Sequence, residues 1–225
     1  MGRRPKTYIP FEQKTEIHPW IAHPIIPSKP RSLILGSFPP NKFTTHRERL
    51  SQCDMDFFYG SKENAFWELF LETMDLNLKL PDELINLKGW LVDNQWTVTD
   101  IVKESQRKKD TAFDADLIVV KWNIEAIKAI FRDNSIDNLF FTSQWVKEKF
   151  DVFIKPFLEN VLFENLNQTI LLSPSRNGLR KAKLAKFTTH KCKEDETAEQ
   201  YRKRYYKLVL KTNITADPGI AKVGY

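Results

Sequence analysis

The chain has 225 residues, of which 41% are hydrophobic and 28% are charged, so an ordinary buried core can form. No apolar run reaches the roughly 18–20 residues that cross a bilayer, and the basic start of the chain lacks the apolar segment of a secretory signal. Two cysteines, Cys53 and Cys192, and four scattered histidines are too few for a zinc or iron–sulfur site. We therefore expect a cytoplasmic monomer with no membrane partner, no metal and no cofactor.

Positive charge is concentrated late in the chain, which carries a net charge of +6 and has a pI near 9.2. Residues 165–193 contain no acidic side chain, and a second basic cluster follows directly. The second cluster consists of Arg202, Lys203, Arg204, Lys207 and Lys211. Such a stripe is typical of proteins that bind the phosphate backbone of nucleic acids, although a solvated lysine-rich surface gives the same pattern.

The first thirty residues are rich in proline and end in HPWIAHPIIPSKP. Proline fixes φ and removes a backbone donor, so neither a helix nor a central strand fits this segment. We expect residues 1–30 to form an extended arm that packs over a single domain of residues 31–225.

Strand-like and helix-like segments alternate from residue 32 onward. The apolar run SLILG predicts a buried strand at 32–36, and further strands are expected at 96–102, 137–142 and 169–172. Apolar residues at helical spacing predict helices at 64–74 and 123–131, another around 145–154 and a closing helix around 198–208. This alternation predicts a three-layer α/β/α fold around a mostly parallel four-stranded sheet. In such sheets the site lies beyond the carboxyl ends of the strands, so we expect it in the loops after Gly36, Thr142 and Leu172.

The loop after the first strand reads Gly36-Ser37-Phe38 followed by two prolines. A glycine at a strand end lets the backbone approach a ligand closely, and the prolines stiffen the segment that follows. The amides around Ser37 and Phe38 are candidate donors to a ligand. An ordinary strand-end turn explains the same residues.

A second segment, FFYGSKENAFW, covers residues 57–67. Tyr59 could offer a flat face to a nucleobase, while Asn64 offers both an acceptor and donors. In the plainer alternative, Tyr59 is a core aromatic and Asn64 is only the N-cap of the next helix.

The loop after the last strand begins SPSRNGLR and lies beside the basic stripe. Small hydroxyl side chains and a glycine suit contacts with phosphates, and Leu179 could wedge between stacked bases. The candidate DNA-binding residues are Ser173, Ser175, Arg176, Asn177, Leu179, Arg180, Lys181 and Lys183. The alternative is a plain basic surface loop.

In this order and spacing, LILGSFPP, FFYGSKENAFW and SPSRNGL resemble the motifs of the uracil-DNA glycosylase superfamily. The resemblance is closest to the hypoxanthine (deoxyinosine) glycosylase branch, with the mismatch-specific uracil glycosylases next, and runs from about residue 32 to residue 210. It implies an enzyme of base excision repair that flips a deaminated base, uracil or hypoxanthine, out of double-stranded DNA. Hydrolysis of the N-glycosidic bond would then leave an abasic site.

The resemblance also implies roles for individual residues. Tyr59 would stack on the flipped base, together with base contacts from Ser37, Phe38 and Asn64. Asn64 is the first candidate for the catalytic polar group, and Asp100 and Ser175 are the reserves.

Two departures from the family pattern leave alternatives open. Phe38 stands where the mismatch-specific enzymes have the asparagine that holds the attacking water, and Ser61-Lys62 replaces His-Pro. A catalytically weak or inactive DNA-binding member of the fold is therefore an alternative. A metal-dependent nuclease is disfavoured, because Val119 stands two positions before Lys121, where such a site needs an acidic residue.

Overall fold

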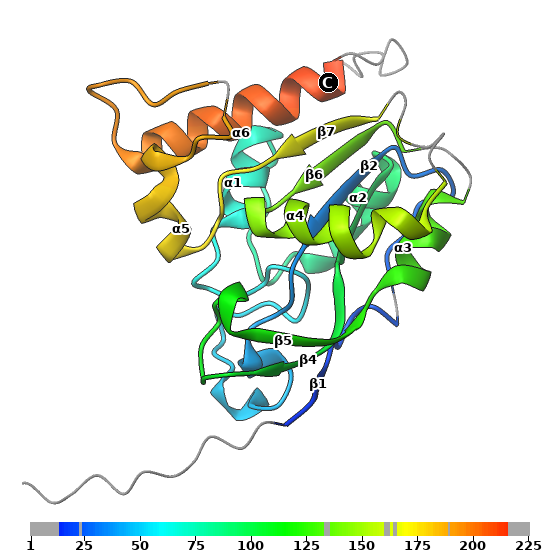
Figure 1. The fold of residues 1–225 in the computed structure, drawn as a ribbon. Helices are drawn as coiled ribbons and strands as arrows, with labels where there is room; N and C mark the ends of the chain where they lie inside the picture. Colours follow the sequence, from blue (N-terminus) through cyan, green and yellow to red (C-terminus); the bar gives the residue numbers. More distant parts are fainter. Residues whose placement is uncertain are drawn as a thin grey trace, which may run out of the picture.

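The computed structural model describes residues 14–22, 24–132, 136–159, 163, 166–188 and 190–215, without the side chains of Asn177, Lys181 and residues 212–215. Its centre is a sheet of four parallel strands in the order β3-β2-β6-β7 (Figure 1). The strands are β2 (Ser32–Gly36), β3 (Trp96–Asp100), β6 (Asn138–Phe141) and β7 (Asn167–Ile170). The predicted parallel sheet is confirmed.

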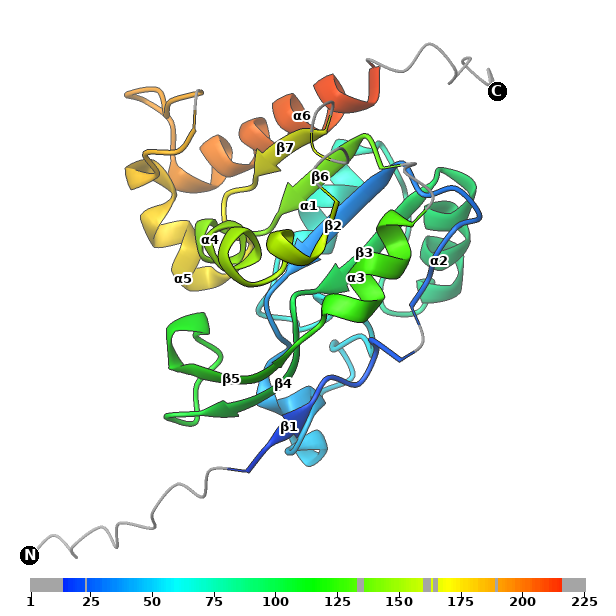
Figure 2. The same ribbon diagram turned by 45° about the vertical axis from the view of Figure 1, so that its right-hand side comes forward.

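Helices cover both faces of this sheet, and the side chains of β2 alternate between the two cores. Ile34 packs in a core with α1 (Phe66–Thr73), α2 (Leu84–Asp93) and α6 (Ala198–Thr215). Leu33 and Leu35 pack in a second core with α3 (Ile124–Phe131) and α4 (Gln144–Phe153). All three side chains are fully buried, as expected for a strand covered on both faces. Figure 2 shows a helical layer on each side of the sheet, which confirms the three-layer α/β/α fold.

A second, antiparallel sheet lies below the carboxyl ends of the central strands in Figure 1. In it β4 (Val102–Arg107) pairs with β1 (Glu16–Ile17) on one side and with β5 (Leu117–Trp122) on the other. The predicted strand at 96–102 is wrong in extent, because β3 ends at Asp100. The chain turns at Ile101, whose amide donates to the carbonyl of Gly36, and then enters the second sheet.

The proline-rich segment before β2 is extended in the described residues 14–22 and 24–30, apart from short turns. It contributes β1 to the edge of the small sheet and passes along β3, where the Thr97 hydroxyl donates to the carbonyl of Ile25. The predicted arm therefore contacts both sheets. Residues 1–13 lie outside the described part of the chain.

Two further elements differ from the prediction because their apolar patterns are weak. Helix α2 was not predicted; it buries Leu87 and Leu91 but exposes Ile85, so no continuous apolar stripe marks it. Strand β7 begins two residues before the predicted 169–172, since Asn167 and Gln168 are exposed at the sheet edge and look like loop residues.

The C-terminal helices close one side of the molecule over β7. The predicted loop SPSRNGLR is wrong in extent, because the short helix α5 (Arg176–Lys181) begins after its capping residue Ser175; α5 and the turn η6 (Ala182–Leu184) lead to α6. The hydroxyls of Tyr205 and Tyr206 donate to the carbonyls of Ile170 and Leu172, at 2.7 and 2.9 Å, and so fix the strand end from which the next loop departs. Among the described residues, no helix combines the length and the apolar character that a bilayer crossing requires.

Candidate active site

A pocket of about 570 Å³ opens at the carboxyl ends of the parallel strands, in the position that the fold predicts. Eight of the residues singled out in the sequence line it: Ser37, Phe38, Tyr59, Asn64, Asp100, Ser173, Ser175 and Arg176. Leu179, Arg180 and Lys183 are not among its lining residues. The side chains of Asn177 and Lys181 lie outside the described residues. The three loop segments of the sequence therefore meet around one cavity.

Asp100 ends β3 and supplies a buried carboxylate to this pocket. Its Oδ2 lies 2.9 Å from Nε2 of His18, which comes from the arm and is itself buried. The other ring nitrogen of His18, Nδ1, accepts a hydrogen bond from the backbone amide of Trp20, so Nε2 is the nitrogen that donates to Asp100. Oδ1 of Asp100 has no hydrogen-bond partner among the described residues, although it is buried. A buried carboxylate with one fixed and one unpaired oxygen is suited to hold a water molecule or a cationic group.

Tyr59 lines the pocket next to this carboxylate, and Gly36 packs closely against both side chains. Tyr59 has φ 57°, an uncommon conformation for a residue with a side chain, and its hydroxyl donates to the carbonyl of Thr99 at 3.3 Å. Burial raises the pKa of the Tyr59 hydroxyl well above its usual value, and the charge of the Asp100 carboxylate and the approach of the hydroxyl to it add to this effect, so the ring stays a neutral phenol. A Cβ at position 36 would lie 2.3 Å from Oδ1 of Asp100 and 2.6 Å from the Tyr59 hydroxyl, so only glycine fits there.

Asn64 joins the second loop segment to the third. Its Oδ1 accepts a hydrogen bond from the amide of Phe66, at the start of α1, so this oxygen is already used inside the protein. Its backbone forms an isolated antiparallel bridge with Ser175, and the amide of Ala65 donates to the carbonyl of Pro174. Of the two polar atoms of the Asn64 side chain, Nδ2 is therefore the one left to act in the pocket.

The loop after the last strand of the sheet, residues 173–178, is held by hydrogen bonds within the loop and by Arg202 of α6. Ser175 caps α5 by accepting from the amide of Gly178, and its hydroxyl lies 3.1 Å from that of Ser173. A Cβ at Gly178 would lie 2.4 Å from Cβ of Ser173, so the loop closes this tightly only around glycine. The buried guanidinium of Arg202 donates to the carbonyls of Ser173 and Ser175. Arg202 is thus an internal support of the loop.

The structure adds a second carboxyl group that the sequence motifs do not include. Asp114 is half-buried at the start of η3 (Asp114–Asp116), the turn between β4 and β5, and it lines the pocket together with Asp100. Burial raises the pKa of Asp114 to about 6; a hydrogen bond from Ser37 opposes this effect, the charge of Asp100 adds to it, and Arg107 opposes it. Sequence reasoning missed Asp114 because it lies outside every recognised motif.

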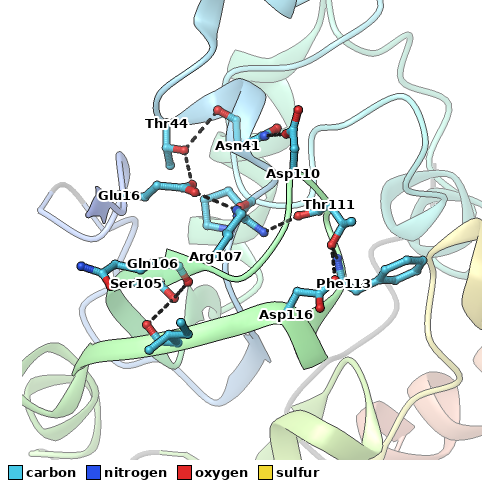
Figure 3. A network of polar contacts seen from close by, with 12 residues as sticks. Glu16, Asn41, Thr44, Ser105, Gln106, Arg107, Asp110, Thr111, Phe113 and Asp116 are labelled. Atoms are coloured by element: carbon cyan, nitrogen blue, oxygen red, sulfur yellow. Dashed lines mark hydrogen bonds and ion pairs between the residues drawn. The ribbon is translucent and has the colours of Figure 1, made fainter. Parts of the chain in front are cut away.

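Buried Arg107 connects the elements around the first loop segment (Figure 3). Its guanidinium pairs with Glu16 of β1 at 2.8 Å and donates to the carbonyls of Thr111 and Pro39 at 2.8 and 2.6 Å. It also lies over the ring of Phe38, which packs edge-on against His18. The Phe38 side chain is therefore largely a core element, and it lines the pocket from within that core.

The basic side chains late in the chain fall into two groups. The first is exposed and has no carboxylate partner within the described ranges; it includes Arg176, Arg180, Lys183 and Lys186. The second basic cluster does not form an open cationic surface as predicted. Arg202 is buried, Lys203 and Lys207 pair with Glu72, Arg204 with Glu196 and Lys211 with Asp75. Carboxylates therefore pair with four of the five cations, and two of these carboxylates, Glu72 and Asp75, are distant in sequence.

Leu179 was the predicted wedge residue, and in the structure it is half-buried in α5. Leu184, five residues later in η6, is 77% exposed beside Lys183. Leu184 is therefore the more accessible apolar side chain on this basic surface. Over the described residues, no three His, Cys, Asp or Glu side chains are grouped as metal ligands.

Of the comparisons with known proteins, only the one with solved structures finds a similar chain, and it bears on the fold alone. No protein-family model matches the chain, and no curated protein matches it. Among solved structures, one similar chain is a solution NMR structure from Methanosarcina acetivorans that is provisionally described as a uracil DNA glycosylase. The two chains share 16% identity and a TM-score of 0.50, over 83% of this chain and 94% of the other. At this identity the likeness establishes the fold, which matches that neighbour's α/β architecture.

Proposed function

We propose that this protein is a DNA glycosylase that binds a deaminated base, uracil or hypoxanthine, in the pocket and hydrolyses its N-glycosidic bond. The observation that carries the proposal is the buried carboxylate of Asp100, with its unpaired Oδ1, next to an aromatic ring and an amide in one pocket. The volume of about 570 Å³ lies within the range of sites for small ligands. The motif resemblance and the shared fold with a provisionally described uracil DNA glycosylase support the same activity.

The chemistry follows from where the charges develop. Cleavage of the bond leaves an electron-poor sugar carbon and an electron-rich base. In the proposed complex, Tyr59 stacks on the base, while Asp100 orients a water molecule toward C1′ and accepts its proton. His18 acts as a positioning residue, because its hydrogen bond to Oδ2 leaves Oδ1 as the oxygen that faces the reaction. Asn64, whose oxygen is occupied by Phe66, contributes its Nδ2 as a donor to the base or sugar.

We propose duplex DNA as the partner, on the basis of the exposed cations beside the pocket. Arg176 belongs both to the pocket lining and to this charged surface, so a strand bound along Arg180 and Lys183 would pass the pocket entrance. The product should be an abasic site in an intact strand. Lys42, a lysine at the pocket, is bonded to Asp54 and Glu63 and is thereby kept from attacking the sugar.

The test is base release from duplexes that contain uracil, hypoxanthine or xanthine, compared with an undamaged duplex. Asp100→Asn should lower the single-turnover rate by at least ~10²-fold, the lower end of what a positioned general base contributes. Asp137→Asn is the matched control, since Asp137 lies at the opposite end of the sheet in a half-exposed pair with Arg31.

The main alternative is an inactive DNA-binding protein of the same fold. The engagement of Asn64 with the helix start is the observation that favours it. Tight binding to all of these duplexes, without base release by the wild-type protein, would decide for this alternative.

A further inference from the structure

Asp114 is a second carboxyl group in the pocket that holds Asp100. The two approach the cavity from different elements, Asp100 from the end of β3 and Asp114 from the η3 turn of the β4–β5 hairpin. The Ser37 side chain and the charge of Asp100 both act on the Asp114 carboxyl. Asp114 is thus placed at the pocket and coupled to the proposed base, although the assigned mechanism does not use it.

The turn that carries Asp114 is held on both sides. Arg107 donates to the carbonyl of Thr111, and the Thr111 hydroxyl donates to Asp116 at 2.6 Å. The amide of Lys108 donates to the carbonyl of Asp116 at 2.8 Å and closes the base of the hairpin. Figure 3 shows this network around Arg107, Thr111 and Asp116. Such support keeps a side chain in one orientation, as catalysis requires.

Resting on the proposed glycosylase activity, we propose that Asp114 is the general acid that protonates the departing base, and that the substrate is therefore a deaminated purine. Two carboxyl groups on either side of a scissile bond, one acid and one base, are the arrangement that hydrolyses sugar glycosides through an oxocarbenium-like state. A purine leaves poorly as an anion, and protonation at N7 lets it depart neutral. Uracil gains less from an acid at this position.

The proton and electron balance is complete without a further reagent. The C1′–N9 bond breaks, and its electron pair goes to the purine as the Asp114 proton is transferred to N7. Water forms the new C1′–O bond, and its proton goes to Asp100. Solvent then returns the proton from Asp100 to Asp114, so that the net reaction is hydrolysis to a free base and an abasic site.

Burial, more than the charges around it, lets Asp114 hold a proton at mildly acidic pH. Asp100 and Arg107 act on it from β3 and β4, Lys108 and Lys149 line an adjoining pocket with it, and Asp116 shares its turn. With a pKa raised to about 6, chiefly by burial, Asp114 keeps its proton more readily than an ordinary aspartate. Because the acid form is required, cleavage of a purine substrate should be fastest below pH 6 and fall as the pH rises through that value.

The test compares Asp114→Asn with Asp137→Asn, whose carboxylate pairs with Arg31 at the opposite end of the sheet, on two duplexes. One duplex contains hypoxanthine, and the other contains N7-methylhypoxanthine, whose positive charge removes the need for an acid. Asp114→Asn should lower the single-turnover rate on hypoxanthine by ~10²-fold or more and leave that on the methylated base nearly unchanged. Asp137→Asn should cleave both as the wild type does.

Ser37→Ala provides a second measurement if Asp114→Asn fails to fold. It removes the hydroxyl that lowers the pKa of Asp114, so the alkaline fall of the purine rate should move to higher pH. Equal losses on both bases, wild-type rates in Asp114→Asn, or an unshifted profile in Ser37→Ala would each overturn the inference. So would a wild-type enzyme that releases uracil but not hypoxanthine, since that result keeps the glycosylase proposal and removes the purine preference. Release of no base at all would instead refute the proposed function, and this inference with it.

Discussion

The hydrogen bond between His18 and Asp100 allows a sharp test of the proposed site. Nε2 of His18 donates to Oδ2 of Asp100 at 2.9 Å, and both residues are buried. A hydrogen bond to a charged group is worth about 1.5–3 kcal/mol. If this bond sets the direction of Oδ1, its loss should slow the single-turnover rate by roughly 10- to 100-fold, since 1.36 kcal/mol corresponds to a factor of ten.

Two substitutions at position 18 separate positioning from packing. The amide nitrogen of His18→Gln can occupy the place of Nε2 and should keep most of the activity. His18→Asn places its amide near the position of Nδ1, too short to reach Asp100, and should show the full loss. Urea unfolding of both variants checks the fold. His18→Asn should lower the free energy of unfolding by about 1–3 kcal/mol more than His18→Gln, because it leaves a buried carboxylate unpaired.

The double variant His18→Asn/Asp100→Asn completes the cycle. Because His18 acts only through Asp100, the double variant should be no slower than Asp100→Asn alone. Losses that multiply, or a wild-type rate in His18→Asn, would refute the role assigned to His18.

Three further predictions concern the pocket wall and the charged surface. Replacing Arg180 and Lys183 by Gln should reduce the slope of log K for DNA binding against log salt by about 0.9 for each phosphate that the protein no longer neutralises. The control Lys203→Gln/Lys207→Gln should leave this slope unchanged, because those charges pair with Glu72. Equal slopes in the two variants would exclude the proposed DNA path. Tyr59→Ala should weaken binding to a duplex with an uncleavable base analogue by about 1–3 kcal/mol, whereas Tyr59→Phe should bind it as the wild type does. A binding titration measures both affinities, and equal affinities of the two variants would argue against stacking. Gly36→Ala should lower the free energy of unfolding by about 1–3 kcal/mol, because its Cβ meets Asp100 and Tyr59. Gly89→Ala, with open space in α2, should raise the free energy of unfolding by about 0.5–1 kcal/mol. Denaturant titration measures both, and an unchanged stability in Gly36→Ala would contradict the close packing of Gly36 against Asp100 and Tyr59.

The sequence predicted the central sheet well because its strands are buried on both faces. The run Leu33–Leu35 and the aromatic residues of β6 are apolar without interruption, which is typical of parallel strands under two helical layers. The small sheet escaped prediction for the opposite reason. Strand β4 reads VKESQR, and its polar residues are stabilised by partners such as Glu16, which lies 91 residues before Arg107.

The candidate site was predicted in part for a similar reason. Tyr59, Asn64 and Asp100 lie in loops or at strand ends that the fold places together, so their meeting in one pocket followed from topology. His18 and Asp114 carry no signal of their own, because His18 is brought to Asp100 by a long-range hydrogen bond and Asp114 by the pocket that the two carboxyl groups share. Likewise, the pairing of Lys203 and Lys207 with Glu72 depends on how α6 packs against α1, which charge counting along the sequence does not reveal.

The contacts of the arm also bear on how this protein can fold. Glu16 and His18 leave the ribosome early, whereas their partners follow much later: Arg107 comes 91 residues after Glu16, and Asp100 comes 82 residues after His18. Until the hairpin and β3 exist, the arm has nothing to bind, and closing so long a loop is entropically costly. A protein shortened to begin at Arg31 would retain every strand of the central sheet, yet it would leave two buried charges without their partners. The pocket should therefore be among the last parts of the molecule to become ordered, after the sheet that supports it.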